Sequence, residues 1–184
     1  MEFLHTPISD LWLVRPHRFI DKRGYFMETY RQESLNPVIG PVTFIQDNES
    51  KSVKGVLRGL HMQTGAHAQA KLIRVTQGAV FDVAVDLRRD SPTFGKWFGA
   101  EINEENGLMM FIPRGFAHGF VVMSDEAKFN YKVDNYYAPQ SELTIKYDDP
   151  DIDIQWPNIE QQFITSEKDI VKSISFKEFL NQLF

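Results

Sequence analysis

Short apolar runs with a period of two fill residues 42–134, and Gly, Pro, Asn and Asp separate them. Successive side chains of a β-strand point to opposite faces, so this pattern predicts strands. The clearest run is AVFDVAVDL, in which one face is formed by Phe81, Val83, Val85 and Leu87. Asp82 and Asp86 fall on the other face, which predicts a half-buried strand with one solvated side.

Similar runs are VTFIQ, GVLRGLHMQ, KLIRVTQ, KWFGAEI, LMMFIP, HGFVVM and KFNYKVD. Their close spacing, without a strand-helix-strand rhythm, indicates an all-β sandwich or barrel. One helix is predicted in ISFKEFLNQLF, where apolar side chains recur at helical spacing at Phe176, Phe179, Leu180, Leu183 and Phe184. We expect this helix to dock on the sheet, and we expect residues 137–168 to form an ordered loop.

The composition sets limits on function. A length of 184 residues fits one domain, which we take as residues 1–184. A net charge of −5 argues against a broad nucleic-acid surface. The absence of cysteine excludes disulfides, thiolate metal sites and cysteine nucleophiles. Since the sequence also has no run of eighteen apolar residues and no basic leader, we expect a cytoplasmic protein without membrane contact.

Two spacings resemble the cupin motifs, which place histidines and a glutamate around a metal inside a small jelly-roll barrel. The second motif, Gly-x5-Pro-x-Gly-x2-His, is matched by Gly107, Pro113, Gly115 and His118. The first motif is matched only in part. Gly55 and His61 fit it, Gln63 replaces the second histidine, and Lys71 stands before Gly78 where the motif has its metal-binding carboxylate.

Lys71, at the position of the metal-binding carboxylate, bears on whether the site holds a metal. Strand alternation puts Lys71 on one face with Ile73 and Val75, and a fixed ammonium there would repel a divalent cation. We therefore expect no metal and no cofactor, and a pocket suited to negative charge on a substrate oxygen. A surface lysine that snorkels its amine into water is the alternative. The same alternation groups His61 with Leu57 and Gly59.

Longer sequence segments extend the similarity beyond these two motifs. They are RGYFMETY, FIQDNES, GVLRGLH, AQAKLIRV, GAVFDVAVDLR, SPTFGKW, FIPRGFAHGF, YKVDNYYAP, YDDPDIDIQWP and SEKD. Together they resemble the dTDP-4-dehydrorhamnose 3,5-epimerase family from about Arg23 to Asp169. The resemblance implies a metal-free cupin jelly roll, a homodimer, and epimerisation of dTDP-4-dehydro-6-deoxy-D-glucose at C3 and C5 to dTDP-4-dehydro-L-rhamnose. That reaction belongs to the synthesis of dTDP-L-rhamnose for surface polysaccharide.

The resemblance also implies the catalytic roles. His61 matches the base that removes a proton next to the C4 ketone, and imidazole has the side-chain pKa closest to neutral pH. Asp169 matches the carboxylate that orients this base and stabilises its protonated form. Lys71 matches the residue that holds the C4 oxygen as it gains charge. Tyr131 matches the acid that returns a proton to the other face of the ring.

Substrate-binding positions follow from the same resemblance. Arg23 and Arg58 match arginines that contact the diphosphate, since a guanidinium can engage two phosphate oxygens in one plane. Tyr137 matches an aromatic residue that stacks on the thymine. Further binding positions are Phe26, Glu28, Gln46, Asp47, Asn48, His118, Glu142 and Lys168. Packing roles are the alternatives for Phe26 and His118.

Two departures from the family pattern lie beside the base. Most relatives have an aromatic residue where this chain has Met62, and the loop TGAH lacks the prolines often found there. These differences leave a mono-epimerase, which inverts C3 or C5 alone, as an alternative. Two alternatives come from other classes of protein: a metal-dependent cupin oxygenase, and a cupin module that binds a dTDP-sugar without catalysis.

Overall fold

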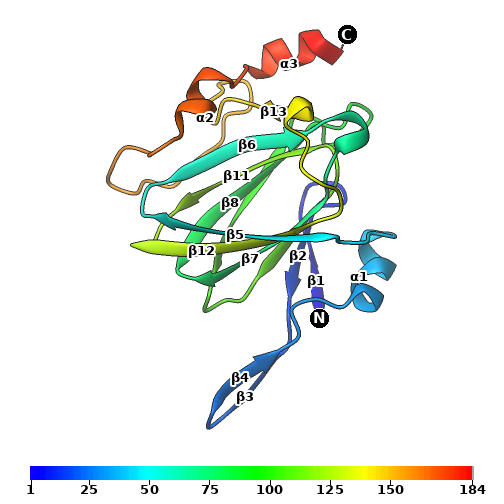
Figure 1. The fold of residues 1–184 in the computed structure, drawn as a ribbon, viewed down its shortest axis with the longest axis vertical. Helices are drawn as coiled ribbons and strands as arrows, with labels where there is room; N and C mark the ends of the chain where they lie inside the picture. Colours follow the sequence, from blue (N-terminus) through cyan, green and yellow to red (C-terminus); the bar gives the residue numbers. More distant parts are fainter. Residues whose placement is uncertain (184) are drawn as a thin grey trace.

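Two antiparallel sheets lie face to face in the computed structural model, which describes residues 1–183 (Figure 1). The six-stranded sheet has the order β1 (Glu2–His5), β2 (Trp12–Arg15), β10 (Met109–Ile112), β7 (Lys71–Gln77), β12 (Glu126–Val133) and β5 (Gln46–Val53). The five-stranded sheet has the order β13 (Glu142–Thr144), β6 (Leu57–Gln63), β11 (Phe116–Val122), β8 (Ala79–Asp86) and β9 (Trp97–Asn103). From β5 to β8 the chain alternates between the sheets, as in a jelly roll.

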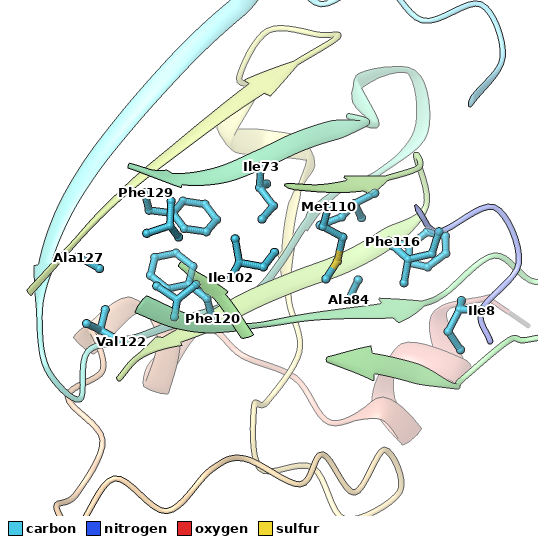
Figure 2. Packing of buried hydrophobic residues seen from close by; sticks show 14 residues of the cluster. Ile8, Ile73, Ala84, Ile102, Met110, Phe116, Phe120, Val122, Ala127 and Phe129 are labelled. Carbon is cyan, nitrogen blue, oxygen red and sulfur yellow. The ribbon is translucent and has the colours of Figure 1, made fainter. Parts of the chain in front are cut away.

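The core lies between the two sheets. Ile73 of β7 and Met110 of β10 point inward from one sheet, and Ala84 of β8 points inward from the other (Figure 2). The rings of Phe120 and Phe129 come from opposite sheets and stack with their centroids 4.1 Å apart. Each fully buried side chain of this size contributes about 1.5–3 kcal/mol. Inward-facing apolar residues of both sheets therefore hold the sandwich together.

Strand β8 differs from the half-buried strand predicted for it. Phe81, Val83, Val85 and Leu87 pack beneath the C-terminal helix α3 (Phe176–Leu183), together with Phe176 and Phe179. Asp82 and Asp86 on the other face are also fully buried. The prediction of a solvated face was wrong because the opposite sheet covers most of it, and the loop at 88–93 covers Asp86. The docking of the C-terminal helix on the sheet agrees with the structure; Phe184 and the side chain of Leu183 lie outside the described residues.

Other differences concern polar or irregular segments. The predicted strand at 42–46 was wrong, because β5 begins only at Gln46 and continues to Val53 through polar residues that pair with β12. Val42 and Phe44 instead pack beside the buried Leu35 of helix α1 (Gln32–Ile39). Strand β13 and the start of α2 (Glu167–Val171) interrupt the loop expected at 137–168, as does the short 3-10 helix Pro139–Ser141. Within residues 1–183 no helix has the length and apolar character needed to cross a membrane.

A two-stranded hairpin, β3 (Arg18–Asp21) and β4 (Gly24–Met27), projects from the body of the protein (Figure 1). It forms a sheet of its own and pairs with neither large sheet. Its large hydrophobic side chains are exposed, namely Phe19, Ile20, Tyr25 and Phe26. The hairpin is thus an apolar projection that nothing in one copy of the chain covers fully.

Candidate active site

A cavity of about 230 Å³ opens between the two sheets, and the stacked rings of Phe120 and Phe129 form part of its lining. The residues predicted from sequence that line it are Arg58, His61, Lys71, His118, Tyr131, Tyr137 and Glu142. A larger hollow of about 590 Å³ beside Trp12 and Arg114 contains none of the predicted residues. The chemistry-bearing side chains therefore gather in the smaller cavity.

His61 of β6 and Asp169 of α2 lie within hydrogen-bonding distance, with 2.6 Å between His61 Nε2 and Asp169 Oδ1. Ser166 caps the short helix α2 by accepting a hydrogen bond from the Asp169 amide, which fixes the carboxylate over the sheet. Burial alone would raise the pKa of Asp169, but the bonds from His61 and Ser166 and the charge of Lys168 hold it below its ordinary value. A carboxylate in this state stabilises a protonated imidazole.

A β-bulge decides which way His61 points. In the pairing of β6 with β11, His61 lies opposite His118 and Arg58 lies opposite Phe120, so β6 has one extra residue in between. Arg58 and His61 consequently both line the cavity although they are three positions apart. The predicted grouping of His61 with Leu57 was wrong for this reason, since Leu57 packs in a separate cluster on the outer face.

Glycine is required inside this bulge. Gly59 has a φ of +136°, a region that residues with a side chain rarely adopt. A Cβ atom at this position would also lie 2.5 Å from the Cα atom of Gly119 on β11. Because the two strands approach so closely, Gly59 allows the geometry that turns both Arg58 and His61 into the cavity.

Lys71 begins β7 and is 9% exposed. Ile73 and Val75 continue its face of the strand into the core, as predicted. Burial lowers the pKa of Lys71 to about 8, although Asp134, Asp82 and Glu142 act in the opposite direction. An ammonium in this environment is poorly solvated, so it gains strongly from a developing negative charge nearby.

A second histidine pairs with a carboxylate on the cavity wall. His118 Nε2 lies 2.9 and 3.1 Å from the two carboxylate oxygens of Asp82, and both side chains are buried. Burial raises the pKa of Asp82, while His118 and Lys71 oppose this effect. Asp82 was not predicted as a site residue, because strand alternation placed it on the face of β8 that was expected to be solvated. Its position in the middle of the apolar run AVFDVAVDL could have indicated a buried carboxylate.

Tyr131 reaches the cavity from β12 in the opposite sheet to His61. It packs beside Phe129, which agrees with the predicted phasing of this strand. Burial raises the pKa of Tyr131, although Arg58 opposes the shift, so the phenol stays protonated. The guanidinium of Arg58 donates to Ser52 Oγ at 3.1 and 3.2 Å. An acid and a base thus enter the cavity from two different sheets.

Two of the lining residues, Tyr137 and Glu142, form a cluster with the predicted Lys168. Tyr137 Oη donates to Glu142 Oε2 at 2.8 Å, and Lys168 Nζ donates to the same oxygen. Burial would raise the pKa of Glu142, but these two bonds hold it below its ordinary value. The carboxylate is therefore ionised and orients the phenol ring of Tyr137.

The remaining predicted residues do not line the cavity. Arg23 lies at the tip of the hairpin, where it pairs with Asp21, and Phe26 on the same hairpin is 70% exposed. The others, at or near the starts of β5 and α1, make pairs of their own: Glu28 with Arg31, Gln46 with Asn48, and Asp47 with Lys132. One copy of the chain does not bring these residues to the cavity of the same copy.

The positions that cupins use for metal ligands hold His61, Gln63, Lys71 and His118, as the motif comparison predicts. All four side chains line the cavity. Across residues 1–183, no three His, Cys, Asp or Glu side chains gather in an arrangement that could hold a metal ion. The four cupin positions supply two imidazoles, an amide and an ammonium, and the ammonium offers no lone pair while it is charged.

Comparisons with known proteins agree on one family. Residues 5–177 match the family model described as dTDP-4-dehydrorhamnose 3,5-epimerase. An enzyme of that name from Salmonella typhimurium is 52% identical over 158 residues, which is 85% of this chain and 86% of the relative.

Solved structures of relatives have the same fold. The dTDP-4-dehydrorhamnose 3,5-epimerase from Elizabethkingia anophelis is 49% identical, covers 97% of both chains and superposes with a TM-score of 0.92. The dTDP-6-deoxy-D-glucose-3,5-epimerase from Legionella pneumophila, solved with dTDP-4-keto-L-rhamnose, is 44% identical, with a TM-score of 0.90 over 94% of this chain and 92% of that one. The predicted all-β cupin-type jelly roll with a short C-terminal helix is confirmed. This chain belongs to the dTDP-4-dehydrorhamnose 3,5-epimerase family.

Proposed function

We propose that this protein converts dTDP-4-dehydro-6-deoxy-D-glucose into dTDP-4-dehydro-L-rhamnose by inverting C3 and C5. The observation that carries the proposal is the cavity itself, in which the His61–Asp169 pair and the buried Lys71 face one opening with Tyr131 across from them. Family membership supports the reaction class, and the ligand held by the Legionella pneumophila relative is the product that we propose.

The base acts on a proton that the substrate already makes acidic. C3 and C5 each lie beside the C4 ketone, so loss of either proton gives an enolate. His61 takes the proton, and the ionised Asp169 stabilises the imidazolium that forms. A positioned acid or base of this kind contributes about 10²–10⁴-fold to the rate.

The enolate and its reprotonation use two other groups. Lys71 holds the C4 oxygen, and a donor of this kind is worth about 2.7–4 kcal/mol. Tyr131 returns a proton to the opposite face of the ring, because it enters the cavity from the sheet opposite His61. Its raised pKa keeps the proton on the phenol until the enolate takes it.

Binding of the nucleotide uses groups at the mouth of the cavity. Arg58 contacts the diphosphate, and Tyr137 stacks on the thymine with its hydroxyl held by Glu142.

We further propose that the protein is a homodimer. The exposed apolar side chains of the hairpin, Phe26 among them, support this, since an unpaired apolar projection of this kind is typical of a subunit interface.

Turnover in heavy water tests the reaction. We expect deuterium from solvent at both C3 and C5 of the recovered nucleotide sugar, because each carbon is reprotonated by the enzyme. Label at a single carbon would demote the protein to a mono-epimerase. Affinity for dTDP without any label would favour a binding module instead. Tightly bound iron in stoichiometric amount, with no label, would favour a cupin oxygenase.

A further inference from the structure

Gln63 is the last residue of β6 and stands two positions after the proposed base. It is 5% exposed, and its side-chain amide forms three hydrogen bonds to backbone atoms. Nε2 donates to the carbonyl oxygens of His67 at 2.8 Å and of Tyr136 at 3.2 Å. Oε1 accepts from the amide of Ala138 at 2.6 Å. Both amide hydrogens and the amide oxygen are therefore used.

Two of these bonds enclose a single residue. The carbonyl of Tyr136 precedes Tyr137, and the amide of Ala138 follows it, so Gln63 holds the backbone on both sides of Tyr137. A neighbouring β-strand would grip the chain in the same way, through one carbonyl and one amide that flank a residue. The side chain of Gln63 thus replaces a strand at a place where the loop has none.

Gln63 also lies opposite the residue that orients the Tyr137 side chain. Gln63 pairs with Glu142 in the register of β6 and β13, and Glu142 accepts the hydrogen bond from the Tyr137 hydroxyl. Gln63 therefore holds the backbone on both sides of Tyr137 through its side chain, and it lies directly opposite the carboxylate residue that the Tyr137 hydroxyl contacts. The ring of Tyr137 is about half exposed, so packing alone does not orient it.

We propose that Gln63 is a positioning residue, which presets Tyr137 at the cavity mouth and thereby sets the affinity for the nucleotide without setting the rate of proton transfer. The inference rests on the proposed function, because it assigns Tyr137 to the nucleotide. It also gives a role to the position where metal-binding cupins have their second histidine. In this chain that position holds the Gln63 amide, which hydrogen-bonds the backbone of the two loops that contain His67 and Tyr137.

Gln63→Met tests the proposal, because methionine fills a similar volume and can replace none of the three bonds. We expect the Kd for dTDP, measured by calorimetry, and the KM to rise about tenfold or more, since buried backbone groups lose their partners and the loop no longer presets Tyr137. The kcat should stay within about twofold, because uniform binding alone is lost. The matched control is Gln161→Met, whose single bond to the Lys54 carbonyl lies on the surface, and it should leave all three constants unchanged.

A double-mutant cycle with Tyr137→Ala separates positioning from a general loss of structure. If Gln63 acts through Tyr137, then Gln63→Met in the Tyr137→Ala background should change the Kd for dTDP by less than about twofold. Additive effects would overturn the proposal. So would a kcat that falls by the same factor as kcat/KM, or a Kd that stays at the wild-type value.

A second variant covers the case in which Gln63→Met does not fold. Gln63→Glu keeps the acceptor for the Ala138 amide but loses both donors, and we expect the same rise in the Kd for dTDP. Unchanged dTDP affinity in a folded Gln63→Glu protein would refute the inference. Wild-type binding separates the two proposals: wild-type protein that neither binds dTDP nor exchanges protons refutes the proposed function. A wild type that does both, beside variants of unchanged affinity, refutes only the inference about Gln63.

Discussion

Two histidines line the cavity, and each is paired with a carboxylate, but the surroundings of the two pairs differ. His61 and Asp169 meet across 108 positions of sequence, and the His61 side chain is 34% exposed. His118 and Asp82 come from neighbouring strands, and their side chains are 9% and 0% exposed. The carboxylate pKa is lowered in the first pair and raised in the second. Pairing is common to both histidines, whereas an accessible ring backed by an ionised carboxylate is found only at His61, which is why we propose His61 as the base.

The largest expected effect comes from removing the accessible ring. His61→Ala should reduce kcat by about 10²–10⁴-fold or more, because the other imidazole that lines the cavity, His118, is only 9% exposed and is bonded to Asp82. The Kd for dTDP should change little, since the base contacts the sugar. Solvent deuterium incorporation and calorimetry measure the two effects. Unchanged turnover would show that the buried His118, or another group, is the base.

Lys71 lines the cavity together with the histidines of both pairs, and its removal tests the proposed stabilisation of the enolate. Lys71→Ala should lower kcat by about 10²–10³-fold, equivalent to about 2.7–4 kcal/mol of enolate stabilisation. Steady-state kinetics on the nucleotide sugar give the value, and the Kd for dTDP serves as the control for folding. A loss confined to KM would mean that Lys71 binds substrate and enolate equally.

Matched substitutions of the two carboxylates sharpen the comparison. Asp169→Asn should lower kcat by about a hundredfold, because the amide no longer stabilises the imidazolium. Asp82→Asn should lower kcat by less than about tenfold but reduce the free energy of unfolding by about 1–3 kcal/mol, because it disturbs a fully buried hydrogen-bonded pair. Rate assays and urea unfolding of both variants test this. Equal losses of rate would remove the distinction between the pairs.

The smallest effect is a pH dependence. Lys71 must be charged to stabilise the enolate, and burial lowers its pKa to about 8, so kcat/KM should fall as pH rises through about 8. Lys71→Arg should keep a flat profile of kcat/KM around pH 8, at a lower rate, because arginine stays protonated.

The lowered pKa of Lys71 affects stability in the opposite direction, since the free energy of unfolding rises with pH while kcat/KM falls. The folded protein binds fewer protons than the unfolded chain between about 8 and 10.5, so this group makes unfolding less favourable as pH rises in that window.

Lys71 and His61 show which neighbours could be predicted from the sequence and which could not. Lys71 was assigned to the face of Ile73 and Val75 correctly, because alternation within one strand is a local property. His61 was assigned to the wrong set of neighbours, because the bulge at Gly59 depends on pairing with β11. The polar strand Gln46–Val53 escaped notice for a similar reason: its backbone pairs with β12, and its side chains carry no apolar pattern.

The sequence by itself determined the strands with alternating apolar residues and the C-terminal helix. Its longer segments, such as GVLRGLH and FIPRGFAHGF, also determined the family. Only the tertiary structure decided which faces are buried. Asp82 became an interior carboxylate because a second sheet covers it, and Asp169 reached His61 because α2 folds back over β6. The physical reason is that strand formation depends on neighbours in the chain, whereas burial and ionisation depend on whatever packs against the strand from elsewhere.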